Sequence, residues 1–179
     1  MTYPYLSGIN YESIADGPGI RVAIFLSGCT HNCKGCHNPQ THDPCFGQEI
    51  TSEIIDEIVQ YIKRNPYITG ITLTGGDPMY DIEKTANLLY SLRHRLGERW
   101  KQLDIWVYTG YKWKQLMDCY QENNDVGRIF ALTDVIVDGK FFEKYADTRL
   151  AFRGSSNQRI IDVRKSMKYG IPVLWNAVQ

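Results

Sequence analysis

Three cysteines, Cys29, Cys33 and Cys36, lie within eight consecutive residues in the spacing C-x3-C-x2-C. Three thiolates on one short loop form a metal-binding set, and two kinds of centre fit them. A structural zinc ion takes four ligands and would need one more side chain. The nearby side chains that could supply it are His31, His37, His42 and Cys45. A four-iron cluster held by three thiolates instead leaves one iron open to a ligand that is not protein.

The remaining composition limits the classes of protein and of partner. Cys45 and Cys119 stand apart, and an odd, clustered set of five cysteines is unlike the paired cysteines of secreted disulfide proteins. Lys and Arg together number 20, as do Asp and Glu, and no basic run stands out. The first residues lack a signal-peptide pattern, and no apolar stretch approaches the length of a membrane-spanning helix. We therefore expect a cytoplasmic protein that binds neither nucleic acid nor a membrane.

The cysteine loop must be positioned by the element that precedes it. Residues 20–26 are rich in β-branched and other apolar side chains and end at Ser27-Gly28, which predicts a buried strand leading into the loop. We expect His31 and His42 to be solvated loop residues. Further along, Thr51 can N-cap a helix that stops before Asn65-Pro66. The apolar stripe of that helix consists of Ile54, Ile55, Ile58, Val59 and Ile62.

Strands and helices alternate along the rest of the chain. The predicted strands are residues 68–74, 103–108 and 135–137, and the turns that follow them are Gly75-Gly76-Asp77-Pro78, Thr109-Gly110 and Asp138-Gly139. A helix is predicted between Asp81 and Gly97, and a shorter one contains Trp113 and Leu116. Residues 160–163 and 171–175 are candidate late strands, the second at an edge or terminus because of Pro172.

This alternation predicts an α/β fold with a mostly parallel sheet, in a single domain of residues 1–179. Ligand sites in such folds gather at the carboxyl ends of the strands, whether the sheet is open or curled into a barrel. We therefore expect the cysteine loop and the turns after the three later strands to face one common site. A closed eight-stranded barrel takes about 250 residues, so too few strands are available here to complete one.

The stretch 16–29, Asp-Gly-Pro-Gly-Ile-Arg-Val-Ala-Ile-Phe-Leu-Ser-Gly-Cys, together with Cys33 and Cys36-His37-Asn38, resembles the signature of radical S-adenosylmethionine activating enzymes, which activate glycyl radical enzymes. Within that family, the chain is most similar to activators of anaerobic ribonucleoside-triphosphate reductase. That similarity rests on Lys34-Gly35-Cys36, on Gly75-Gly76-Asp77-Pro78, on residues 152–159 and on the short length. Many radical S-adenosylmethionine proteins carry an aromatic residue in place of Gly35, whereas the reductase activators share the small residue.

The resemblance implies a fold, a cluster and a cofactor. The fold would be an incomplete parallel β/α barrel with the cluster loop at the carboxyl end of the first strand. Cys29, Cys33 and Cys36 would hold a [4Fe-4S] cluster, whose fourth iron would chelate the amino and carboxylate groups of S-adenosylmethionine. One-electron reduction would then break a carbon–sulfur bond and give a 5′-deoxyadenosyl radical, with the protein positioning and shielding the cofactor. No side chain need act as a general acid or base.

The resemblance also implies roles for residues around the cofactor. Gly35, Cys36 and His37, the last through its backbone, would lie beside it. Gly75, Gly76 and Asp77 match the element that binds the methionine amino group, since glycines permit close approach and an acidic side chain or a carbonyl accepts from an ammonium. The remaining candidates are Asp138, for a monovalent cation near the cofactor carboxylate, Asn157, for the methionine part, and Arg159, for the carboxylate itself.

The implied partner is anaerobic ribonucleoside-triphosphate reductase, on which the radical would be made at a backbone glycine, and the implied electron donor is a flavodoxin. Two alternatives differ in function. One is another radical S-adenosylmethionine enzyme, either a pyruvate formate-lyase activase or a small-molecule enzyme of the deazaguanine pathway. The other is a zinc-stabilised binding module without catalytic activity.

Overall fold

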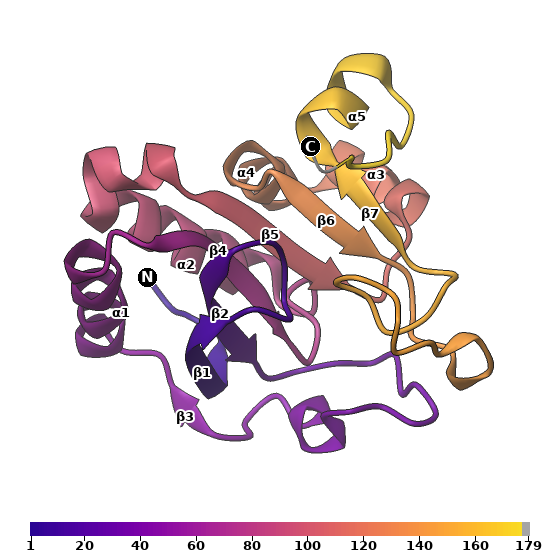
Figure 1. Ribbon diagram of the computed structural model, residues 1–179, viewed down its shortest axis with the longest axis horizontal. Helices are drawn as coiled ribbons and strands as arrows, with labels where there is room; N and C mark the ends of the chain where they lie inside the picture. Colours follow the sequence, from indigo (N-terminus) through magenta and orange to yellow (C-terminus); the bar gives the residue numbers. More distant parts are fainter. Residues whose placement is uncertain (177–179) are drawn as a thin grey trace.

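The computed structural model of the chain describes residues 1–176, whose strands form one seven-stranded sheet in the order β3-β1-β2-β4-β5-β6-β7 (Figure 1). The strands are β1 (Tyr5–Ser13), β2 (Ile20–Leu26), β3 (Gln48–Glu49), β4 (Ile68–Gly75), β5 (Asp104–Thr109), β6 (Val135–Asp138) and β7 (Arg159–Asp162). The α-helices are α1 (Ser52–Arg64), α2 (Ile82–Leu96), α3 (Trp113–Glu122), α4 (Asn124–Leu132) and α5 (Val163–Tyr169). Short 3-10 helices are η1 (Pro39–His42), η2 (Gly97–Gln102) and η3 (Glu143–Tyr145).

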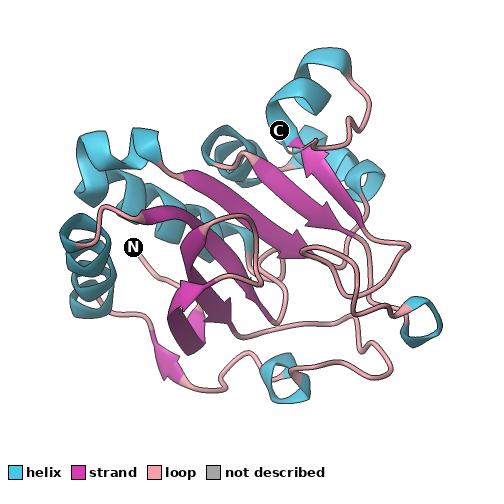
Figure 2. Ribbon diagram, in the orientation of Figure 1, coloured by secondary structure: helices cyan, strands magenta, loops and turns pink. Residues whose placement is uncertain are grey.

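The centre of the sheet is parallel, as the alternation of strands and helices predicted. β2, β4, β5 and β6 pair in parallel, so their carboxyl ends lie at the same edge. β1 pairs with β2 antiparallel, and β7 pairs with β6 antiparallel. The sheet is open within the described residues, with β3 and β7 at its edges. The long segments 27–47 and 139–158 follow the carboxyl ends of β2 and β6 mostly as loops (Figure 2).

The sheet has two different faces because side chains alternate along each strand. Val22, Ile24 and Leu26 of β2 belong to the main core, together with buried apolar side chains from helices α1 to α5. On the other face, Trp106, Val135 and Val137 form a smaller cluster, against which Phe152 and other partly buried side chains pack. Among the described residues, no α-helix contributes to this smaller cluster. One face of the sheet is therefore covered by helices and the other by loops.

The two longest helices form where their caps and apolar stripes predicted them. The Thr51 side chain accepts a hydrogen bond from the Ile54 backbone N–H at 3.4 Å and so begins α1. Asp81 caps α2 in the same way through Lys84, and Gly97 ends it with a positive φ of 58°. Four apolar side chains of α1 are buried, and each contributes roughly 1.5–3 kcal/mol to stability. These four are Ile55, Ile58, Val59 and Ile62.

Several elements differ from the prediction. β1 was not predicted, because its sequence mixes polar residues and Gly8 with few buried side chains, so the cysteine loop follows the second strand and not the first. Helices α4 and α5 were also missed. Of the predicted strand 160–163, residues 160–162 lie in β7 and Val163 begins α5. Residues 171–175 make only the single bridge between Ile161 and Leu174 instead of a strand. The single-domain prediction includes residues 177–179, which lie outside the described residues.

Among residues 1–176, the helices are all too short or too polar to span a bilayer.

Candidate functional site

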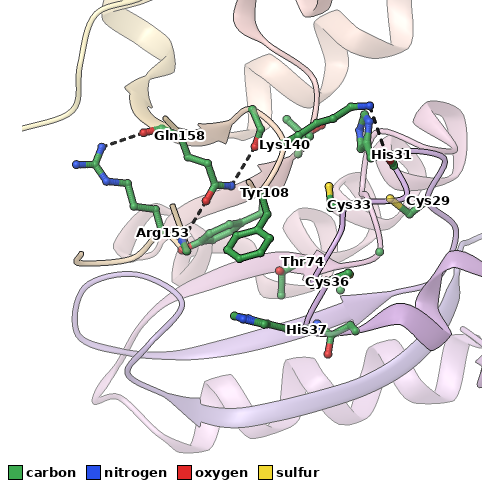
Figure 3. A pocket seen from close by; sticks show the side chains of 18 of the residues that line it. Cys29, His31, Cys33, Cys36, His37, Thr74, Tyr108, Lys140, Arg153 and Gln158 are labelled. Carbon is green, nitrogen blue, oxygen red and sulfur yellow. Dashed lines mark hydrogen bonds between the residues drawn. The ribbon is translucent and has the colours of Figure 1, made fainter. Parts of the chain in front are cut away.

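A cavity of about 420 Å³ opens on the loop-covered face of the sheet, at the carboxyl ends of the parallel strands (Figure 3). Cavities of this volume suit small-molecule ligands. Its wall includes residues from the turn at the end of each of the four parallel strands. These are Cys29 after β2, Gly75 and Gly76 at β4, Thr109 and Gly110 at β5, and Gly139 after β6. The expectation that these four turns share one site is confirmed.

All three cysteines of the C-x3-C-x2-C loop line this cavity, half-buried and with free thiols. Burial raises the pKa of the Cys29 and Cys33 thiols, and backbone hydrogen bonds at His31 and Phe141 partly offset that rise. A bound metal would remove these protons, because a thiol that coordinates a metal is deprotonated. In the described part of the chain, no three His, Cys, Asp or Glu side chains are placed so that they could together hold one metal ion. Cys45 and Cys119 are exposed and do not line the cavity.

The turn after β4 packs directly on the cysteine loop. The Gly76 N–H donates to the Leu26 carbonyl at 2.7 Å, and the Asp77 N–H donates to the Gly28 carbonyl at 2.8 Å. A Cβ atom on Gly76 would lie 2.6 Å from the Gly28 oxygen, so only glycine fits at this position. Gly75 has a φ of +103°, a conformation that other residues rarely adopt. Both glycines therefore allow backbone to approach backbone and leave their own backbone exposed on the cavity wall.

Asp77 differs from its neighbours, because its side chain is buried and does not line the cavity. Its Oδ1 accepts from the Met79 N–H at 2.8 Å. Its Oδ2 accepts from the Thr109 hydroxyl and from the Gly110 N–H, both at 3.0 Å, and from His31. The carboxylate is thus engaged within the protein, and the structure does not present it to a ligand in the cavity.

The expectation that His31 is a solvated loop residue was wrong. Its side chain is only 7% exposed, and its Nε2 lies 2.5 Å from Asp77 Oδ2. His42, expected to be solvated too, is half-buried and lines the cavity. His37 also lines it, with its ring 5.4 Å from that of Phe141. Gly35 lies near Phe141 but is not on the wall.

Asp138 and Arg159 meet each other instead of the cavity. They are register partners on β6 and β7, and the Arg159 guanidinium makes a bidentate contact with the Asp138 carboxylate. Asp138 is 1% exposed and also accepts from the Trp113 N–H at 2.7 Å, at the start of α3. The Asn157 amide donates to the Lys140 carbonyl at 2.8 Å, while its Oδ1 is buried without a partner. None of these three side chains lines the cavity.

Polar side chains on the wall that were not singled out from the sequence include Tyr108, Lys140, Arg153 and Gln158 (Figure 3). The Gln158 side chain accepts from the Gly154 N–H at 3.0 Å and donates to the Gly139 carbonyl at 3.0 Å, which joins two loops. Arg153 donates to the Gln158 carbonyl at 2.9 Å. Arg153 and Gln158 lie in residues 152–159, a segment on which the resemblance to the reductase activators rests. Lys140 directly follows the predicted Asp138-Gly139 turn.

Sequence comparison places the chain among known proteins. The family described as "4Fe-4S single cluster domain" matches residues 15–161. A relative from Enterobacteria phage T4 is 37% identical over 159 residues, which cover 85% of this chain and 93% of the relative. A relative from Escherichia coli K12 is 38% identical over 156 residues, covering 84% and 94%. Both are named anaerobic ribonucleoside-triphosphate reductase-activating protein, as is a Vibrio cholerae relative at 38% identity. This chain belongs to that activating-protein family.

The donor set of this activating protein fits the iron–sulfur cluster that its family description names. The residues matched, 15–161, include the cysteine loop and the turns at the ends of all four parallel strands. Thiolates are soft ligands and are the usual ligands of iron–sulfur clusters. Three of them on one wall of a cavity leave room beside them for a further ligand.

The loop 14–19 of the activating protein is tied to the sheet by a buried arginine. Arg21 is fully buried, and its guanidinium donates to the Thr72 hydroxyl at 2.7 Å and the Pro18 carbonyl at 2.9 Å. The Thr72 hydroxyl in turn donates to the Asp16 carbonyl at 2.7 Å. Asp16, the first residue of the Asp16-Gly17-Pro18-Gly19 stretch, lies on the cavity wall.

Proposed function

We propose that this protein activates anaerobic ribonucleoside-triphosphate reductase by making a glycyl radical on it, using a [4Fe-4S] cluster and S-adenosylmethionine. The observation that carries the proposal is the shared cavity. It brings the three thiols together with the glycine turn after β4, at the carboxyl ends of the parallel strands. Membership in the activating-protein family supports the choice of the reductase as the partner.

In this proposal, Cys29, Cys33 and Cys36 would hold three irons of the cluster, and the fourth iron would have no protein ligand. When bound, the cluster and S-adenosylmethionine supply one-electron cleavage of a carbon–sulfur bond, which gives methionine and a 5′-deoxyadenosyl radical. Gly75 and Gly76 let the chain approach the methionine amino group closely, and backbone carbonyls accept from it. Because the Asp77 carboxylate is already satisfied by four donors, it is not the acceptor.

The chain also positions the cofactor and shields it. Lys140 and Arg153 bring positive charge to the wall, which suits the cofactor carboxylate. The four parallel strands act as the arc of an incomplete β/α barrel, and its loop-covered face admits the glycine-bearing segment of the reductase. The electron comes from a separate protein, which the sequence resemblance suggests is a flavodoxin.

Anaerobic reconstitution with iron and sulfide tests the proposal. The wild-type protein should turn brown, form 5′-deoxyadenosine from S-adenosylmethionine when reduced, and produce a glycyl doublet in electron paramagnetic resonance when the reductase is added. Cys33→Ala should lose both the colour and the product, whereas Cys119→Ala, at an exposed cysteine outside the cavity, should keep both. A colourless wild-type protein with stoichiometric zinc and no cleavage of S-adenosylmethionine would establish the zinc-stabilised binding module instead.

The identity of the partner is tested by offering the protein different substrates. The reductase, pyruvate formate-lyase and small-molecule substrates of the deazaguanine pathway are each incubated with the reduced protein. We expect the glycyl doublet with the reductase. A doublet only with the lyase, or a small-molecule product alone, would reject the reductase as the partner.

A further inference from the structure

A buried histidine–aspartate contact joins the cysteine loop to the turn after β4. His31 lies between Cys29 and Cys33, and its Nε2 donates to Asp77 Oδ2 at 2.5 Å. The two side chains are 7% and 2% exposed. A hydrogen bond to a buried carboxylate is stronger than one in water, so this contact fixes the loop more firmly than a surface contact would.

The same contact extends to the turn after β5. The Asp77 carboxylate that receives His31 also receives the Thr109 hydroxyl and the Gly110 N–H, so one side chain holds all three turns together. The His31 ring packs edge-on to Tyr111, with ring centroids 4.6 Å apart. A Cβ atom on Gly110 would lie 2.2 Å from the His31 ring, so the glycine leaves the space that the ring fills.

Because of the position of His31 in the loop, this contact can affect the placement of the neighbouring thiols. His31 is two residues from Cys29 and two from Cys33, and its backbone hydrogen bond to Cys29 lies on the same loop. Lys140 reaches from the segment after β6 to the His31 carbonyl at 3.5 Å (Figure 3). A shift of the ring would therefore move two of the three thiols relative to Gly75 and Gly76.

We propose that His31 is a positioning residue, which with Asp77 clamps the cysteine loop against the turns after β4 and β5. The clamp would keep the iron that has no protein ligand correctly placed relative to the backbone that binds the amino acid part of S-adenosylmethionine. This inference rests on the proposed function and deepens it. It assigns Asp77 a role through His31 in place of direct contact with the cofactor.

The test uses the reconstituted protein and four variants: His31→Ala, His31→Gln, Asp77→Asn and the double variant with His31→Ala and Asp77→Asn. Iron and sulfide content should match the wild type, because all three thiols remain. The dissociation constant for S-adenosylmethionine should rise at least tenfold in His31→Ala and in Asp77→Asn, a size typical of residues that orient metal ligands. His31→Gln, whose amide can still donate to Asp77, should recover most of the affinity.

Two further readouts separate positioning from direct binding. The double variant should lose no more affinity than Asp77→Asn alone, since the His31 contact is already absent once Asp77 is replaced. The change that S-adenosylmethionine causes in the electron paramagnetic resonance spectrum of the reduced cluster should be altered in His31→Ala even at saturating cofactor. His94→Ala, at an exposed histidine of α2 outside the cavity, is the control and should behave as wild type.

Several results would overturn the clamp. They are wild-type affinity in His31→Ala, losses that add in the double variant, and loss of the cluster itself in His31→Ala. If His31→Ala does not fold, His31→Gln and Asp77→Asn decide, and wild-type affinity in Asp77→Asn rejects the clamp. If the wild-type protein binds no S-adenosylmethionine, the proposed function fails and the clamp fails with it, whereas wild-type binding with unaffected variants rejects the clamp alone.

Discussion

The pair of Asp138 and Arg159 illustrates how burial decides the role of a charged residue. From the sequence, Asp138 was a candidate for holding a monovalent cation near the cofactor carboxylate and Arg159 for binding that carboxylate, yet they bind each other across β6 and β7. Asp138 is almost completely buried, whereas the Arg159 side chain is 38% exposed. A buried carboxylate needs a partner, because removing one member of such a pair leaves an uncompensated charge.

Arg159→Met should therefore reduce stability. We expect the free energy of unfolding to fall by about 2 to 3 kcal/mol, because Asp138 would keep only its hydrogen bond from the Trp113 N–H. Urea denaturation of the protein without cofactor measures the change. Arg149→Met is the matched control, since Arg149 pairs with Asp147 at the surface, where water screens the charges, and its loss should cost clearly less stability. Equal stability of the two variants would show that the pair on β6 and β7 is dispensable.

At the residue scale, the sequence predicted groups of residues that lie close together along the chain. It missed contacts between residues that lie far apart along the chain. The three cysteines are close in the chain, so their common place on one wall could be anticipated. His31 looked like a loop residue because its partner Asp77 lies 46 positions away. Distance in sequence also hid the engagement of Asp77 by Thr109 and Gly110, which lie 32 and 33 positions further along the chain.

At the scale of elements, Gly76 after β4 shows that a turn can pack closely against a loop where it carries no side chain. Gly76 has no room for a side chain, because the Gly28 and Thr41 carbonyls lie 2.6 and 2.8 Å from where its Cβ would be. Backbone atoms cannot move aside as a flexible side chain can. A methyl group here would push the turn away from the cysteine loop.

Gly76→Ala should therefore weaken both the fold and the site. We expect a loss of about 1 to 3 kcal/mol in the free energy of unfolding, as is usual for an overpacked buried position. The affinity for S-adenosylmethionine should fall as well, because the turn and the loop separate. Denaturation and equilibrium binding measure the two effects. Gly8→Ala, at a strand glycine with open space around it, should change neither, and a tolerated Gly76→Ala would contradict the close packing described above.

Elements with strong periodic patterns were predicted well, and those with weak patterns were not. α1, α2 and the parallel strands β2, β4, β5 and β6 combine clear apolar patterns with caps or turns. β1 lies near the edge of the sheet, where partial burial tolerates polar residues and glycine, so its sequence carries little signal. The seven-residue helix α5 begins at Val163, directly after Asp162, where β7 ends, which made strand and helix hard to separate.

At the scale of the whole molecule, helices cover one face of the sheet and loops cover the other. The cavity opens among these loops, and its wall includes Asp16, Leu150 and Phe152. In the proposed function, a segment of the reductase enters through this side. Binding should then bury the loops and leave the helix-covered face in solvent.

Hydrogen–deuterium exchange followed by mass spectrometry checks this expectation. On addition of the reductase, exchange should slow in residues 14–19 and 140–158. α1, which packs on the other face, should show no change and serves as the internal control. Protection of α1 with unchanged loops would mean that the reductase binds the wrong face for the proposed reaction.

The difference in cover between the two faces of the sheet also bears on how an air-sensitive centre would survive. Dioxygen is small and could enter a cavity that opens among loops, so a centre held there in the isolated chain would be open to damage. A large protein seated across the opening would act as a shield as well as a substrate. The lifetime of the centre in air should then lengthen with the fraction of time that the two proteins spend together.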